Sequence, residues 1–145
     1  MQAEPVATIA HVIQLSVAPV FLLMGVAAFL NVLTGRLSRV IDRARVLERE
    51  LLAQDTGLPG KTHDMLRILA TRARWINIAI SLCVGSAILV ATVVMVLFAS
   101  AFWARDSAGA VAGLFITAMI ALICGLVFFL REIYLATSSL RIGAH

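Results

Sequence analysis

The chain has 145 residues, of which 61% are hydrophobic and only 14% are charged, and its mean hydropathy is +1.00. Soluble domains average about 25% charged and about 45 to 50% apolar residues, so this composition excludes an ordinary soluble domain and predicts a membrane protein. Two cysteines are too few for the disulfide framework of a small secreted domain. Nucleic acid is not an expected partner, despite a pI near 10.0, because the basic residues gather in one segment between apolar runs.

Three apolar stretches predict three transmembrane helices, since each exceeds the roughly 20 residues of helix that cross a bilayer. The predicted helices occupy residues 1–34, 76–103 and 108–130. Backbone groups in lipid must find partners within their own segment, which favours helices, and the predicted fold is therefore an all-α membrane protein. We expect the first stretch to be retained, because no basic residue precedes its apolar run, which is longer than that of a signal peptide.

The segment 35–75 predicts a helical hairpin between the first and second spans. Apolar residues recur at spacings of three and four on both sides of the glycines and proline in 55–60, a pattern typical of two helices joined by a turn. Thr62 and Asp64 are suited to begin the second helix. We therefore expect an antiparallel hairpin here, a short turn at 104–107 and a tail at 131–145.

The distribution of lysine and arginine predicts the orientation. Nine of the twelve basic residues lie in the segment 34–74, whereas the turn at 104–107 holds one and the tail holds two. Cytoplasmic segments carry the excess of basic residues. The hairpin and the C-terminus are therefore expected in the cytoplasm, with the N-terminus and the turn at 104–107 on the outside.

The basic segment also resembles a known family. Asn31 to Arg45 read NVLTGRLSRVIDRAR, and Arg72 to Asn77 read RARWIN. This arginine-rich stalk, joined to two spans, resembles the domain of unknown function 2721 family of small bacterial membrane proteins. The resemblance covers almost the whole chain and implies the same topology in a bacterial inner membrane. It implies no activity and no substrate.

The first span is the most polar of the three, and Pro19 and Gly25 interrupt it. Polar side chains within a span are costly against lipid and often mark a water-filled path. The candidates to line a pore around the axis of a homo-oligomer are His11, Gln14, Ala18, Asn31 and Thr34. For His11, contact with water at the outer surface is an equal alternative.

Basic residues follow the first span and precede the second. Arginines so placed can hold anionic lipid headgroups or ring the cytoplasmic mouth of a pore. The candidates are Arg36, Arg39, Arg43, Arg72 and Arg74. The alternative without a ligand is a solvated helix face with ion pairs at spacings of three and four.

Small residues recur every four positions in the third span, as Gly109, Gly113, Thr117, Ala121 and Gly125. A shorter and more polar row occurs in the second span, as Asn77, Ser81 and Gly85. Rows of small residues let another transmembrane helix approach closely. They predict helix packing, either within the chain or with a second copy.

Apart from Glu4, which precedes the apolar run of the first span, no carboxylate lies inside a predicted span, and neither a metal-binding nor a phosphate-loop motif is present. We therefore expect no catalytic, cofactor or metal site and no enzymatic activity. The leading hypothesis is a homo-oligomeric ion channel or pore whose first span lines the axis, with membrane lipids, further copies of the chain and ions as partners. The alternative is a non-conducting membrane anchor whose basic hairpin binds anionic lipid or a partner protein.

Overall fold

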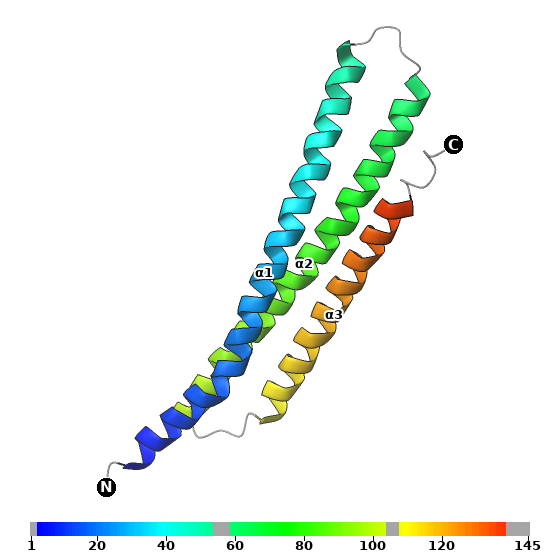
Figure 1. Cartoon of the computed structure of the whole chain (residues 1–145). Helices are drawn as coiled ribbons and strands as arrows, with labels where there is room; N and C mark the ends of the chain where they lie inside the picture. Colours follow the sequence, from blue (N-terminus) through cyan, green and yellow to red (C-terminus); the bar gives the residue numbers. More distant parts are fainter. Residues whose placement is uncertain (1–2, 54–58, 104–107, 139–145) are drawn as a thin grey trace. The chain divides into compact units, whose positions relative to one another are not determined.

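The computed structural model describes residues 3–53, 59–103 and 108–138. Within these ranges it consists of α1 (Ala3–Ala53), α2 (Pro59–Trp103) and α3 (Ala108–Ser138), shown in Figure 1. Each helix contains a stretch long and apolar enough to cross a membrane. The described residues are therefore all helical, and the protein is a multi-pass membrane protein.

Two of the helices are longer than a bilayer requires. At 1.5 Å per residue, the 51 residues of α1 and the 45 residues of α2 extend about 77 and about 68 Å, whereas the hydrocarbon core is about 30 Å thick. Both helices therefore continue well beyond any span that they form. Pro19 lies inside α1 without ending the helix.

The helix ends differ in detail from the sequence pattern. α2 begins at Pro59, ahead of the predicted start at Thr62, because proline at the first helical position already has a helical φ and needs no partner for an N–H. α3 continues past Leu130 to Ser138, into the predicted tail. Residues 55–58 of the predicted turn at 55–60, the predicted turn at 104–107 and the last residues of the tail lie outside the described residues, and the last two residues of the first turn belong to α2.

The buried positions of each helix recur at a period close to seven. On α1 they include Val12, Pro19, Val26, Leu33 and Val40, and on the part of α3 from 108 to 134 they are Ala118, Gly125 and Glu132. On α2 they include Ile76, Ala79, Cys83, Ser86, Val90 and Val93, at alternating spacings of three and four. A period of seven keeps one helix face directed at its neighbours, as in coiled coils. The buried face of α3 therefore includes a carboxylate.

The chain divides into two compact units, each containing parts of all three helices. Unit 1 comprises Met1–Leu30 and Leu82–Ile123, and unit 2 comprises Asn31–Ser81 and Cys124–His145. Eleven of the twelve basic residues belong to unit 2. Any chemistry that depends on positive charge must therefore be sought there.

A buried contact between two small residues joins α2 to α3 in unit 1. The Ser86 hydroxyl donates a 2.8 Å hydrogen bond to the Ala118 carbonyl oxygen, and both residues are fully buried. Small side chains at the contact let two helices approach closely, and such hydrogen bonds between membrane helices contribute about 0.6 to 1.7 kcal/mol. In unit 1, α2 and α3 are thus joined by a buried contact without charged groups.

In unit 2 the segments of α1 and α2 lie side by side (Figure 1). Val40 from α1 and Leu69 from α2 are both buried, and both line the cavities between the two segments. The end of α3 also belongs to this unit. It brings the buried carboxylate of Glu132 to the two basic segments.

Candidate anion-binding site

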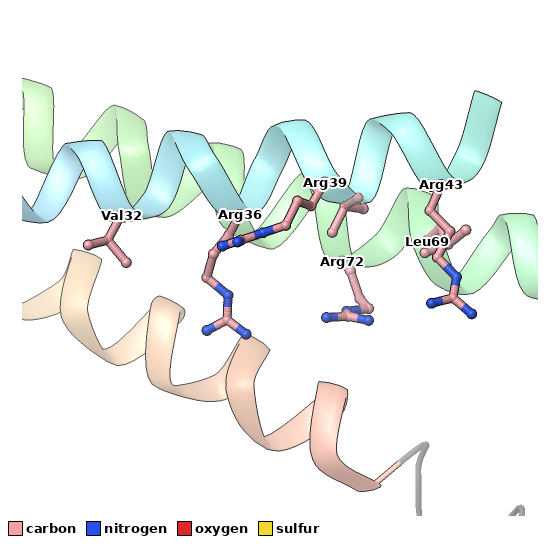
Figure 2. Close-up of a pocket in the computed structure, with 7 residues that line it drawn as sticks. Val32, Arg36, Arg39, Arg43, Leu69 and Arg72 are labelled. Carbon is pink, nitrogen blue, oxygen red and sulfur yellow. The ribbon is translucent and has the colours of Figure 1, made fainter. Parts of the chain in front are cut away.

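Four arginines line one pocket in unit 2. Arg36, Arg39 and Arg43 come from α1 and Arg72 comes from α2, around a cavity of about 470 Å³ (Figure 2). The apolar part of the lining is Val32, Val40 and Leu69. Since the three α1 arginines are three and four residues apart, they share one face of the helix. We call these seven residues the arginine pocket.

The arginine pocket lies where two apolar runs meet the basic segments. Arg36 follows the buried Leu33 by three residues, about 4.5 Å along α1. Arg72 precedes the buried Ile76 by four residues, about 6 Å along α2. Long basic side chains at such positions place their charge in the interface between lipid and water.

A fully buried carboxylate, that of Glu132 on α3, faces two of these arginines. Arg72 donates to Glu132 Oε1 from Nε and Nη2, at 3.2 and 2.9 Å. Arg36 Nη1 lies 3.7 Å from Oε2, near enough for an ion pair but too far for a hydrogen bond. Within the described part of the chain, Oε2 accepts no hydrogen bond. Glu132 therefore binds Arg72 closely and Arg36 loosely.

Aromatic rings hold the end of α3 next to the pocket. Trp75 stacks on Phe128 with ring centroids 5.6 Å apart, and the Arg131 guanidinium lies 4.9 Å from the centre of the Trp75 ring. The Arg36 guanidinium lies 5.4 Å from the centre of the Phe129 ring. Cation–π contacts of this kind contribute about 0.5 to 2 kcal/mol each. The end of α3 thus contacts α1 through Arg36 and α2 through Trp75 and Arg72.

The pocket retains an excess of positive charge. Glu132 is shared between Arg36 and Arg72, whereas Arg39 and Arg43 are exposed and form no ion pair with the residues that the structure describes. Four guanidinium groups and one carboxylate leave a net charge of about +3, and like charges on one helix face repel each other. Guanidinium groups match phosphate and carboxylate oxygens with paired hydrogen bonds. The arrangement is therefore suited to binding an anion.

Residues 16–142 match a family described as protein of unknown function (DUF2721). The chain belongs to this family. The resemblance predicted from the basic segment is thus confirmed, and the matched range contains the arginine pocket and Glu132. Neither a curated protein nor a solved structure matches the chain. Membership of the family names no ligand, so a function has to be inferred from the geometry of the site.

The pocket contains four of the five arginines predicted to form a pore mouth or a headgroup site. Arg74, the fifth, is exposed and is not part of its lining. Two residues turn a helix by about 200°, so Arg74 points away from the side that Arg72 occupies. The two predicted arginines of α2 therefore lie on different faces of that helix.

The predicted pore-lining residues of α1 are exposed on the single chain: His11, Gln14, Ala18, Asn31 and Thr34. The Thr34 hydroxyl donates a 3.1 Å hydrogen bond to the Asn31 carbonyl oxygen within its own helix. Asn31 and Thr34 lie about 140° and about 160° around α1 from Arg36, so they are separate from the arginine pocket. Their place in a pore stays a prediction.

The predicted rows of small residues turn away from the buried face. Gly125 is buried and Ala121 and Gly85 are half-buried, but Gly109, Gly113, Thr117, Asn77 and Ser81 are exposed. A Cβ atom added at Gly109, Gly113 or Gly85 would meet no atom within 4 Å. A spacing of four drifts about 40° per step around a helix, so such a row cannot follow one straight contact. Packing of these rows against a second copy stays a prediction.

Glu132 is the charged residue of the site that the sequence pattern does not predict, because it directly follows an apolar run and resembles an ordinary polar helix end. A spacing of seven along α3 predicts that Glu132 is buried. Counting from Ala118 through Gly125 leads to Glu132, and all three are buried. An acid at an inward position of this kind needs a cation from a neighbouring helix.

Proposed function

We propose that this protein binds the phosphate-bearing headgroup of an anionic membrane lipid in the arginine pocket. The observation that carries the proposal is the excess charge of the pocket, where four arginines meet one carboxylate. Basic residues at the membrane surface attract anionic lipid with about 1 kcal/mol each. Neither this function nor the second candidate below requires catalysis.

A lipid suits the pocket because its lining is both charged and apolar. Val32 lies one helical turn before Arg36 on the side of the apolar run, and it is 52% exposed although it lines the pocket. A phosphate could bind the guanidinium groups while an acyl chain follows Val32 toward the hydrocarbon core. An acidic protein segment would match the arginines but not this apolar edge.

The proposed orientation places the pocket at the cytoplasmic face of a bacterial inner membrane. The segments of α1 and α2 in unit 2 would form an antiparallel hairpin in the cytoplasm, together with the C-terminus, and the N-terminus would be outside. The asymmetry of basic residues supports this orientation, and the cytoplasmic leaflet is rich in anionic lipid. A Thr56→Cys variant lacking the two native cysteines should react with a membrane-impermeant reagent only after permeabilisation. Labelling in intact cells would overturn the orientation.

The lipid proposal can be tested by native mass spectrometry of the protein in a neutral detergent. Short-chain phosphatidylglycerol, which is anionic, should remain bound, whereas phosphatidylcholine with the same chains should dissociate. Arg39→Gln together with Arg43→Gln should abolish this preference, because both residues line the pocket. Arg49→Gln together with Arg67→Gln removes the same charge outside the pocket and should preserve it. Equal retention of both lipids by the wild type would refute lipid recognition and favour a protein partner.

A homo-oligomeric pore is the second candidate, favoured by the exposure of His11, Gln14 and Asn31 on α1 of the single chain. These side chains are costly against lipid, and a water-filled axis between copies would accommodate them. In liposomes, Asn31→Leu should close the pore by dewetting it, and Arg39→Glu should change its preference between anions and cations. If the wild type passes no cation or anion, the pore is excluded and lipid binding remains.

A further inference from the structure

We propose that Glu132 is a built-in competitor of the lipid phosphate. In this mechanism its carboxylate holds Arg36 loosely, and an anion that enters the arginine pocket takes Arg36 from it. The inference rests on the proposed function, since it describes how that same pocket is regulated. It assigns Glu132 a role in setting the affinity for anionic lipid, in addition to its role in stability.

The unequal contacts of the two Glu132 oxygens carry this proposal. Both hydrogen bonds from Arg72 go to Oε1, at 3.2 and 2.9 Å, so Arg72 is firmly attached to the carboxylate. Oε2 has only the 3.7 Å ion pair with Arg36 and accepts no hydrogen bond from the described residues. An ionised oxygen that is buried without a hydrogen bond is under-satisfied. Arg36 is therefore the weakly held partner of the pair.

Arg36 belongs to the ion pair and to the pocket at the same time. Its guanidinium approaches Glu132 Oε2 and also lies over the Phe129 ring. Its side chain is 28% exposed and lines the cavity. A phosphate could offer this guanidinium two short hydrogen bonds, where Glu132 offers it none. The exchange of one acceptor for the other requires the Arg36 side chain alone to turn.

When Arg36 leaves Glu132 for the ligand, the loss of the Arg36–Glu132 ion pair reduces the free energy of binding. Once Arg36 turns to the ligand, Oε2 loses its nearest cation while the carboxylate stays buried beside Arg72. A buried charge that loses a partner is destabilised. Glu132 therefore lowers the affinity of the pocket, which fills only where anionic lipid is abundant.

The same exchange links lipid binding to α3. Arg36 connects α1 to α3 through Glu132 and Phe129, whereas Arg72 and Trp75 connect α2 to α3. A bound phosphate would release the first connection and leave the second. Asp42, the acid on α1 closest in sequence to the pocket arginines, is exposed and is not part of the lining, so Glu132 is the competing group.

The test compares Glu132→Gln with the wild type, using phosphatidylglycerol titrations in a neutral detergent and thermal unfolding without lipid. Competition predicts that Glu132→Gln unfolds at a lower temperature yet binds phosphatidylglycerol about three- to tenfold more tightly, because the guanidinium groups lose their internal anion. A purely structural role predicts that stability and affinity fall together. Where the wild type binds phosphatidylglycerol, a folded Glu132→Gln variant that binds it equally or more weakly would overturn the proposal.

A second variant covers the case in which Glu132→Gln does not fold. Glu132→Asp keeps the charge but withdraws the carboxylate by one methylene, so it should release Arg36 more readily and raise the affinity by a smaller factor. In an Arg36→Gln background the same substitution should have no effect on affinity, since the contested side chain is absent. A rise of equal size in both backgrounds would contradict competition for Arg36.

Inorganic phosphate serves as a second probe and separates the two proposals. If Glu132→Gln strengthens binding of phosphate while phosphatidylglycerol binds neither protein, the competition is supported and the lipid assignment fails. If the wild type prefers phosphatidylglycerol but the Glu132 variants do not alter its affinity, the lipid assignment stands and the competition fails.

Discussion

Units 1 and 2 are built from the same three helices but are stabilised by different interactions. Unit 1 joins α2 to α3 through small residues and the buried hydrogen bond from Ser86 to Ala118. Unit 2 joins the helices through Glu132, Arg36 and Arg72, next to further arginines that lack a partner among the described residues. The uncharged contacts of unit 1 offer no charged group to a ligand. The arginines of unit 2 can exchange an ion pair within the protein for a contact with an anionic ligand. We therefore place function in unit 2.

The largest predicted loss of stability follows from Arg72→Ala. This change removes both hydrogen bonds to Glu132 and leaves a buried carboxylate with only the distant Arg36, which should cost about 3 to 5 kcal/mol. Unfolding by denaturing detergent in mixed micelles would measure the difference. Arg74→Ala is the matched control, because Arg74 is exposed on the same helix, and it should change the stability by less than about 0.5 kcal/mol. Equal effects of the two changes would refute the role of the ion pair.

Unit 1 should be sensitive to side-chain size. Ser86→Leu places a large side chain at a fully buried contact and should cost about 1 to 3 kcal/mol through overpacking. Ser86→Ala loses only the hydrogen bond to Ala118 and should cost about 1 kcal/mol. The same micelle unfolding experiment applies, with the exposed Ser81→Leu as control. If Ser86→Leu were tolerated as well as Ser81→Leu, close packing would not be what stabilises unit 1.

Gly113→Leu should leave the stability of the single chain nearly unchanged, because a Cβ there meets no atom within 4 Å. If the row containing Gly113 packs against a second copy, the larger side chain should separate the copies, while Gly113→Ala should be much milder. Size-exclusion chromatography with light scattering in a neutral detergent would measure the oligomer. An unchanged oligomer for both variants would show that this face of α3 contacts lipid.

The sequence predicts the parts of this protein that depend on local pattern. Uninterrupted apolar runs suffice to identify three helices, and the spacing of Arg36, Arg39 and Arg43 suffices to place them on one face. The inclusion of Arg72 in the same pocket is less local, because it depends on α1 and α2 lying side by side. The hairpin pattern predicts that Arg72 belongs to the same basic cluster as the arginines of α1. It does not predict that these residues line a cavity.

Short sequence patterns did not predict which residues of the helices are buried. The rows at a spacing of four, such as Asn77 and Ser81, drift around the helix and are exposed, while the positions at a period of seven are buried. The role of Glu132 was not predicted either, because its partners lie 96 and 60 residues away in the chain. Which long-range partner a polar residue meets is decided by the tertiary fold and not by its neighbours in sequence.

The most direct test of the central claim is the stabilisation of the protein by anionic lipid. A ligand that binds only the folded state at about 100 times its Kd stabilises it by about 2.7 kcal/mol, so phosphatidylglycerol should raise the Tm of the wild type and phosphatidylcholine should not. Arg39→Gln together with Arg43→Gln should remove this rise, since both side chains line the pocket and form no ion pair with the described residues. An equal rise in the wild type and in this double variant would contradict the arginine pocket as the lipid site.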